Sequence, residues 1–230
     1  MNKGISEIDT YKVIRPLFGD VSYDANHMPI INRADYSKIN WDTLDIRGLQ
    51  NLYLRQNSRN TLLSMFCYDK RLLALWNSPL KKIPIFQTYA AIATPDFSLY
   101  PSMNYNEIRH NVYMSRWLGK TWQSYGCTII PTVGWALPDT YDICLGAIEK
   151  GSVVIISTLG CTNHTTEFLN GFEEMKRRIE PPIIIVVGNM LPGMTGTFIN
   201  FKYDDGFATQ YEQLKLEGFS SIFTISKEAE

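Results

Sequence analysis

The stretch SVVIISTLGCTNHTTEFLNGFEEMKRRIEPPIIIVV, residues 152–187, decides the fold. It begins and ends with apolar, β-branched runs of strand length, at 152–157 and 183–187. Between these runs, apolar residues recur at helical spacing over 165–179, and two consecutive prolines end the pattern. Two nearly continuous apolar strands joined by a helix predict a right-handed βαβ unit, whose strands lie parallel and are covered on both faces.

The same alternation extends outward from this unit. Further strands are expected near 62–68, 86–93, 128–134 and 197–203, and further helices over 104–124, 139–148 and 208–217. A chain of this kind belongs to the α/β class, and we expect its parallel βα units to form a partial or irregular (β/α) barrel. An open doubly wound sheet is the alternative. No GxGxxG motif follows any of the runs, which removes the commonest reason to prefer a dinucleotide-binding sheet.

The first 60 residues differ in composition and in apolar pattern from the rest. They are rich in Asn, Asp, Tyr and Arg and contain no strong apolar run. We interpret residues 1–60 as an irregular N-terminal extension with short helices around 42–55, and residues 61–230 as the α/β barrel-like domain. With 230 residues, 45% of them hydrophobic, the chain can bury a large core without a disulfide or metal.

Composition excludes several classes of protein. The net charge of -1 argues against sequence-specific nucleic-acid binding, since phosphate contacts need an excess of Lys and Arg. No apolar run approaches the roughly 20 residues of a membrane span, and the first residues lack the pattern of a secretory signal. The four cysteines form no CxxC pair, so we expect free thiols, with Cys67 and Cys144 buried, and no metal site. A cytoplasmic protein without a membrane partner is expected; no motif names a cofactor.

An ordered string of motifs resembles a known family. The motifs are TPDFSLY (94–100), NVYMSR (111–116), IPTVGW (130–135), STLGC (157–161) and the later Gly188. Together they are similar to a family of uncharacterised proteins from bacteria, phages and other mobile elements, filed as a domain of unknown function. The resemblance covers roughly residues 60–190. It implies a phage or mobile-element origin and an intracellular setting, and it carries over no catalytic residue.

Candidate catalytic residues follow from the expected fold. Parallel α/β domains bind ligands beyond the C-terminal ends of their strands, and Asp69 and Asp96 each follow a predicted strand. If the two carboxylates meet, they could act as an acid/base pair or hold a divalent cation. The alternative is that both only bond backbone N–H groups in their own loops.

Candidate ligand-binding residues lie near the same strand ends. Arg109 and Arg116 share one stripe of the helix expected over 104–124, which could hold a phosphate or form an ordinary solvated face. Thr158 and Gly160 lie in a small-residue loop before a helix, where backbone N–H groups favour an anion, although the loop could simply cap that helix. Trp135, which could stack on a flat ligand, and Asn189 complete the set.

These residues lead to two hypotheses about function. In the first, a phage or mobile-element protein recognises a small anionic ligand, a nucleotide or other phosphate-bearing molecule, at the strand-end rim, and Asp69 and Asp96 could hydrolyse it. In the second, the chain is a non-enzymatic inhibitor or adaptor that binds a host protein through the Tyr- and Asn-rich residues 1–60. The sequence leaves open whether the protein is an enzyme.

Overall fold

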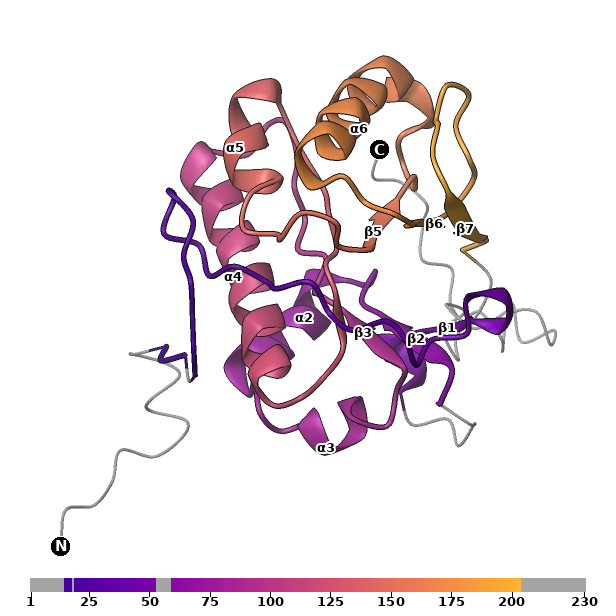
Figure 1. Ribbon diagram of the computed structural model, residues 1–230. Coiled ribbons are helices and arrows are strands. Elements are labelled where there is room, and N and C mark those ends of the chain that lie inside the picture. The colour runs from indigo at the N-terminus through magenta and orange to yellow at the C-terminus, as the bar shows by residue number, and fades with distance from the viewer. Residues whose placement is uncertain (1–14, 18, 53–58, 204–230) are drawn as a thin grey trace, which may run out of the picture.

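The computed structural model describes residues 15–17, 19–52 and 59–203 (Figure 1). The strands are β1 (Asp45–Gly48), β2 (Thr61–Ser64), β3 (Ala91–Ala93), β4 (Ile129–Ile130), β5 (Val154–Ser157), β6 (Ile184–Val187) and β7 (Phe198–Phe201). The α-helices are α2 (Asp69–Asn77), α3 (Ile83–Phe86), α4 (Tyr105–Ser124), α5 (Tyr141–Cys144) and α6 (Thr165–Ile179). The alternation of strands and helices is the one that the apolar pattern predicts.

Every paired strand in the two sheets is parallel to its neighbour. One sheet has the order β1-β2-β3-β4 and the other β5-β6-β7. A parallel bridge between Thr132 and Ile155 joins them, with Val133 N donating to Ile155 O at 2.9 Å. The spatial order therefore follows the chain order, without the reversal that a doubly wound sheet requires. No pairing of β7 with β1 closes a barrel among the described residues, so the predicted parallel α/β fold is confirmed in an open, irregular form.

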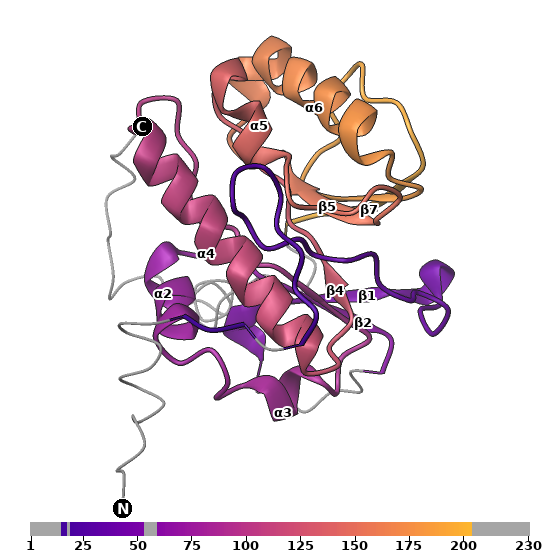
Figure 2. The ribbon, with the colours of Figure 1, turned by 60° about the vertical axis from the view of Figure 1, so that its left-hand side comes forward.

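The helices cover one face of the sheets. In Figure 1 the strands cross the middle of the molecule, with α4 and α5 to the left and α6 above. Figure 2 shows α4 as the longest helix, and its Trp117 and Leu118 pack with Leu63 of β2 and Ile129 of β4. Apolar side chains of α5 and α6 form a second cluster with β5 and β6. The two clusters account for the apolar side chains on this face of β2 to β6.

The opposite face of the sheets is covered by the N-terminal segment. Ile46, Leu62, Ile130 and Ile155 point into this third cluster, which contains no residue of the α-helices. Ile39 and Leu44 close over them, together with the partly buried Tyr36 and Trp41. β1 itself pairs with β2, so the sheet begins inside the region that the sequence analysis sets apart as an extension.

Local signals explain where the longest helix begins and ends. The Asn104 side chain accepts from the Asn106 N–H, and Glu107 accepts from the Asn104 N–H at 2.8 Å, which forms a capping box before α4. Gly126, at φ 82°, follows the last turn and ends the helix.

Three expectations need correction. The strand expected over 86–93 is confined to β3, because α3, with Pro84 in its first turn, ends at Phe86 and residues 87–90 form turns and bends. The helix expected over 139–148 is shorter, since the chain leaves it before Gly146 and takes φ 55° at Ala147. Around 42–52 the structure has two 3-10 turns and β1 instead of helices, and the helix expected over 208–217 lies outside the described residues.

The cysteines and the helix lengths can also be compared with the expectations from the sequence. All four thiols are free; Cys127 and Cys144 are buried, whereas Cys67 and Cys161 are half-buried. Burial of Cys144 is confirmed and that of Cys67 is wrong, since its loop lies at the edge of the core. In the described part of the chain, no helix is long and apolar enough to cross a membrane.

Candidate functional site

The two predicted carboxylates lie at the same edge of the sheet. Asp69 is the first residue of α2, which follows β2, and Asp96 is the third residue beyond β3. Because β2 and β3 are parallel neighbours, their C-terminal ends bring these two loops together. The Asp69 charge is close enough to raise the pKa of Asp96. The structure therefore brings Asp69 and Asp96 close together, although they are far apart in the sequence.

Asp69 is anchored to the loop that carries Asp96. Its Oδ1 accepts from the backbone N–H of Ser98 at 3.2 Å. The side chain of Asn111 in α4 donates to the carbonyl of the same Ser98 at 2.7 Å. The alternative interpretation was that Asp69 only accepts hydrogen bonds from backbone N–H groups of its own loop. Asp69 does bond a backbone N–H group, but one that belongs to the neighbouring loop. The contact holds the loop after β3 in place at the rim.

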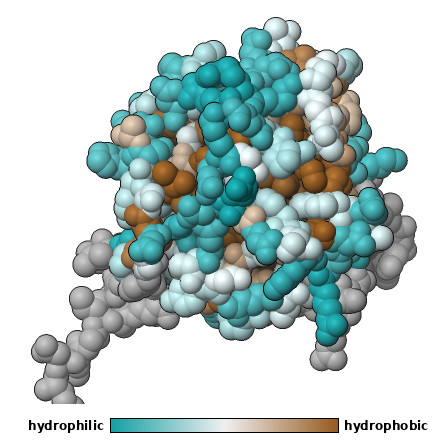
Figure 3. Space-filling model, in the orientation of Figure 1, coloured by the Kyte–Doolittle hydropathy of each residue, from teal (hydrophilic) through white to brown (hydrophobic). Residues whose placement is uncertain are grey.

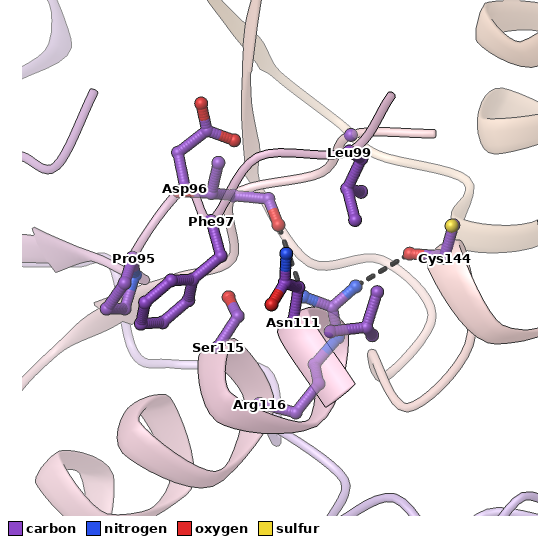
Figure 4. Close-up of a pocket in the computed structure, with 11 residues that line it drawn as sticks. Pro95, Asp96, Phe97, Leu99, Asn111, Ser115, Arg116 and Cys144 are labelled. Carbon is purple, nitrogen blue, oxygen red and sulfur yellow. Dashed lines mark hydrogen bonds between the residues drawn. The ribbon is translucent and has the colours of Figure 1, made fainter. Parts of the chain in front are cut away.

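Asp96 has no such partner. Its carboxylate is half-buried, and no hydrogen bond or ion pair from any described residue reaches it. Figure 4 shows it directed away from the Arg116 guanidinium. Burial, followed by the repulsion of Asp69, raises the pKa of Asp96 to about 7. A carboxyl group with this pKa can both give and take a proton near neutral pH.

A small cavity lies beside Asp96 (Figure 4). Its volume is about 20 Å³, which is room for roughly one water molecule. The polar residues in its wall are Asp96, Asn111, Ser115, Arg116 and Thr132. Ligand pockets that enclose a small molecule measure about 300–1,000 Å³. A ligand at this rim would therefore rest on the surface, and only a single water or a small group would enter the cavity.

A buried hydroxyl network supports the loop from below, and sequence reasoning missed it. Thr94 Oγ1 accepts from the Thr132 N–H at 2.9 Å, and Ser115 Oγ lies 3.2 Å from the same oxygen. The Thr132 hydroxyl in turn donates to the Thr94 carbonyl. The network joins the ends of β3 and β4 to α4, two residues before Asp96. Its only sequence signal is the run of Thr residues directly after apolar strands.

The two arginines of the helical stripe point elsewhere. Arg116 is buried, and its guanidinium donates to the carbonyls of Cys144, Thr132 and Gly146 at 2.8, 3.2 and 3.3 Å. Burial lowers the pKa of Arg116 to about 10. Arg109 donates to the carbonyl of Asn26 at 2.8 Å. Arg116 forms part of the cavity wall, but both side chains donate hydrogen bonds to backbone carbonyls of other segments.

The remaining predicted residues divide between the core and the surface. Trp135 lies against α6, where its ring centroid is 5.1 Å from that of Phe168 and an added Cβ at Gly171 would meet its indole nitrogen at 2.2 Å. Thr158 is buried and donates to the Asn189 carbonyl at 2.8 Å, which links the loops after β5 and β6. The Gly160 and Asn189 residues are exposed at the same rim.

Two glycines of these loops give a matched test of the packing. Gly188 has φ +113°, and an added Cβ would lie 2.5 Å from Thr158 Oγ1, so Gly188→Ala should lower the free energy of unfolding by about 2–4 kcal/mol. Gly160 has φ +77° with nothing within 4 Å, so Gly160→Ala should cost only the backbone strain of about 1–2 kcal/mol. Urea denaturation of both variants measures the difference. If both variants lose the same free energy of unfolding, the Thr158 side chain moves aside at no cost and the predicted steric clash at Gly188 is wrong.

Two thiols lie near the carboxylates. Burial raises the pKa of Cys67 to about 12, with the charges of Asp96 and Asp69 adding to the shift. Burial, and then the charge of Asp96, also raises the pKa of Cys161. Thiols with raised pKa values are poor nucleophiles at neutral pH. In the described ranges, no group of three or more His, Cys, Asp or Glu side chains could hold a metal ion.

The described part of the N-terminal segment is anchored to α4 but still exposes many side chains, among them Tyr23 at 54%. Met28 and Ile31 are buried, and the segment from 26 to 33 is held by Arg109, Lys120 and Gln123 of α4. Residues 1–14 of the proposed host-protein interface lie outside the described residues.

The fold and the rim define an open α/β protein of parallel βα units with a pair of acidic residues at its strand ends. The chain belongs to the family described as Domain of unknown function (DUF4417), which matches residues 45–204. Relatives at 37% identity over 131 residues are the Gene 1 proteins of Mycobacterium phages D29 and L5. The match covers 56% of this chain and 48% and 57% of the phage proteins.

The chain thus spans about half the length of the curated relatives it matches, and it is phage-related. No solved structure matches it significantly. The resemblance stated from the sequence motifs is confirmed.

Proposed function

We propose that the strand-end rim binds a phosphate-bearing ligand, such as a nucleotide, and that Asp96 exchanges a proton with it. The observation that carries the proposal is the Asp96 carboxyl group itself: half-buried, without a described partner, and with a pKa raised to about 7. Leaving a carboxylate in this state is unfavourable for folding, and such groups are concentrated at sites of proton transfer.

The protonation state explains how an anion could be accommodated beside two acidic residues. Below pH 7 the Asp96 carboxyl group is mainly neutral and can donate a hydrogen bond to a phosphate oxygen. Above pH 7 it is ionised and repels the phosphate. The loop that begins at Thr158 would supply backbone N–H groups, and it is near enough for the Asp96 charge to act on Cys161.

Hydrolysis is the reaction that this arrangement would serve. A water molecule in the cavity would attack the phosphorus atom, and its proton would pass to ionised Asp96. The bond to the leaving oxygen would break, and that oxygen would take a proton from solvent. Near pH 7 both forms of Asp96 are populated, so binding and proton acceptance are both possible.

Calorimetric titration with AMP, ribose 5-phosphate and inorganic phosphate at pH 6 and pH 8 tests the proposal. We expect at least one probe to bind, more weakly at pH 8. Asp96→Ala should weaken its binding about 10- to 150-fold at pH 6, the range for one lost charge-assisted hydrogen bond. Asp96→Asn should retain most of the binding and lose the pH dependence. Asp139→Asn, at an exposed position, is the control.

Two outcomes would contradict the proposal. If a probe binds equally well to wild type and to Asp96→Ala, the ligand lies elsewhere. If none of the probes binds at either pH, the phosphate-bearing ligand is wrong.

A further inference from the structure

The two most exposed large hydrophobic side chains in the described residues belong to the loops that carry the two carboxylates. Tyr68 is 82% exposed and Tyr100 is 60% exposed. Tyr68 directly precedes Asp69, and Tyr100 follows Asp96 by four residues. The hydrogen bond from the Ser98 N–H to Asp69 joins the two loops between these tyrosines. Both tyrosines therefore belong to loops that meet at the same part of the rim.

The fold itself gains little from these rings. At 82% exposure the Tyr68 ring buries almost none of its surface, and its side chain makes no capping hydrogen bond to α2. Trp135, which the sequence suggested as the stacking residue, is instead packed on α6. Exposed apolar side chains also border the rim on the neighbouring loops, at Leu159 and Met190. By contrast, Figure 3 shows that the surface over α6 is largely hydrophilic.

We propose that Tyr68 and Tyr100 form a stacking platform for a planar base, so that the ligand of the rim is a nucleoside or nucleotide whose base N–H groups face the Asp69 carboxylate. The inference rests on the proposed function and names its substrate class. Base–aromatic stacking needs an exposed ring and no enclosing pocket, which fits a cavity with room for only one water. Carboxylates are acceptors for the N–H groups of bases.

The charges near the rim favour the base over the phosphate as the main recognition element. Arg109 and Arg116 donate to backbone carbonyls in other segments, so neither guanidinium is directed at a bound phosphate. The Asp69 carboxylate at the same rim is instead available as an acceptor for a base. A guanine base suits this arrangement, because its N1–H and its amino group can be accepted side by side by one carboxylate.

Titration with GMP and ribose 5-phosphate at pH 6 tests the platform, since the second probe has the phosphate but lacks the base. We expect GMP to bind at least about 10-fold more tightly than ribose 5-phosphate. Tyr68→Ala and Tyr100→Ala should each weaken GMP about 5- to 150-fold, the range of one base–aromatic stack. Neither should change ribose 5-phosphate binding, and Tyr→Phe at both positions should retain the GMP affinity.

Tyr125→Ala is the matched control, because Tyr125 is 39% exposed and lies at the other end of α4 from the rim. Both platform tyrosines are exposed, so thermal melting should be unchanged in all three variants. A short single-stranded oligonucleotide distinguishes a base within a strand from a free nucleotide. If the oligonucleotide binds where GMP does not, and the tyrosine variants lose this binding, the platform is supported and its natural ligand is a base within a nucleic-acid strand.

The failure of this inference can be told from the failure of the proposed function. If GMP and ribose 5-phosphate bind equally and depend on Asp96 but not on the tyrosines, the platform is wrong and the phosphate site remains. If GMP depends on the tyrosines but not on Asp96, the platform remains and proton exchange is wrong. If neither GMP nor the oligonucleotide binds, the platform is overturned.

Discussion

Arg116→Ala is expected to lower the free energy of unfolding by about 3–5 kcal/mol. The guanidinium is 2% exposed and donates to three backbone carbonyls, those of Cys144, Thr132 and Gly146. These carbonyls belong to the loop after β4 and to the end of α5, so the substitution leaves buried acceptors without donors at two connections to α4. It also creates a cavity next to the existing one. Urea denaturation followed by circular dichroism measures the loss.

Arg109→Ala is the matched control for this prediction. Arg109 lies on the same helix, is half-buried, and donates to the single carbonyl of Asn26. Its removal should cost about 1 kcal/mol. Arg116→Lys should recover only part of the loss, because one ammonium cannot reproduce the fork of the guanidinium. Equal losses for the Arg109 and Arg116 variants would contradict the role assigned to the three carbonyls.

Asp96→Asn is expected to stabilise the protein increasingly as the pH rises. The folded-state pKa of Asp96 is raised from 3.8 to about 7, first by burial and then by Asp69. Between these values the unfolded chain loses the proton and the folded chain keeps it, so the wild type loses stability as pH rises and has the full penalty above pH 7. Asparagine cannot ionise. Its advantage should therefore grow by about 2–3 kcal/mol between pH 5 and pH 8.

Denaturation curves of both proteins at several pH values measure this difference. Asp139→Asn, at an exposed position, is the control. The neighbouring thiols do not interfere, since the pKa values of Cys67 and Cys161 are raised above the range of the experiment. A carbon-13 titration of the Asp96 carboxyl group gives the pKa directly. An advantage of asparagine that is constant from pH 5 to pH 8 would contradict the raised pKa.

The regular elements were predictable where a local pattern is strong. α6 has the predicted bounds, 165–179, because its apolar residues repeat at helical spacing and two prolines stop it. β5 falls within two residues of its predicted strand and β6 within one. The parallel bridge from Thr132 to Ile155 follows from the βα alternation. The local apolar pattern is sufficient to predict these elements, because buried strands and amphipathic helices form only where apolar residues follow that pattern.

The elements that were missed have no such pattern. α2 starts at Asp69, where no helix was expected, and α3 ends at Phe86, the first residue of a predicted strand. β1 lies in a segment without an apolar run and is held by its pairing with β2. Tertiary packing stabilises these short elements, so their own residues carry little signal.

The candidate site also has features that the sequence predicts and features that it does not. Parallel topology alone placed Asp69 and Asp96 at one rim, and the structure brings them within electrostatic range. The sequence could not decide that Asp69 bonds Ser98 while Asp96 has no described partner, because that depends on how two loops meet. Nor could it distinguish an arginine directed at a ligand from Arg116, which three carbonyls hold.

By itself, then, the sequence determined the α/β class, the parallel alternation and the edge where ligands would bind, because hydrophobic periodicity and chain connectivity are local properties. Only the tertiary structure decided which polar side chains are partnered, which aromatic rings are buried and which pKa values are shifted. Tyr68 and Trp135 show the difference: both are aromatic residues near strand ends, and one is 82% exposed while the other packs on Phe168. Burial and hydrogen bonding depend on residues far apart in the chain, and no spacing within the sequence encodes them.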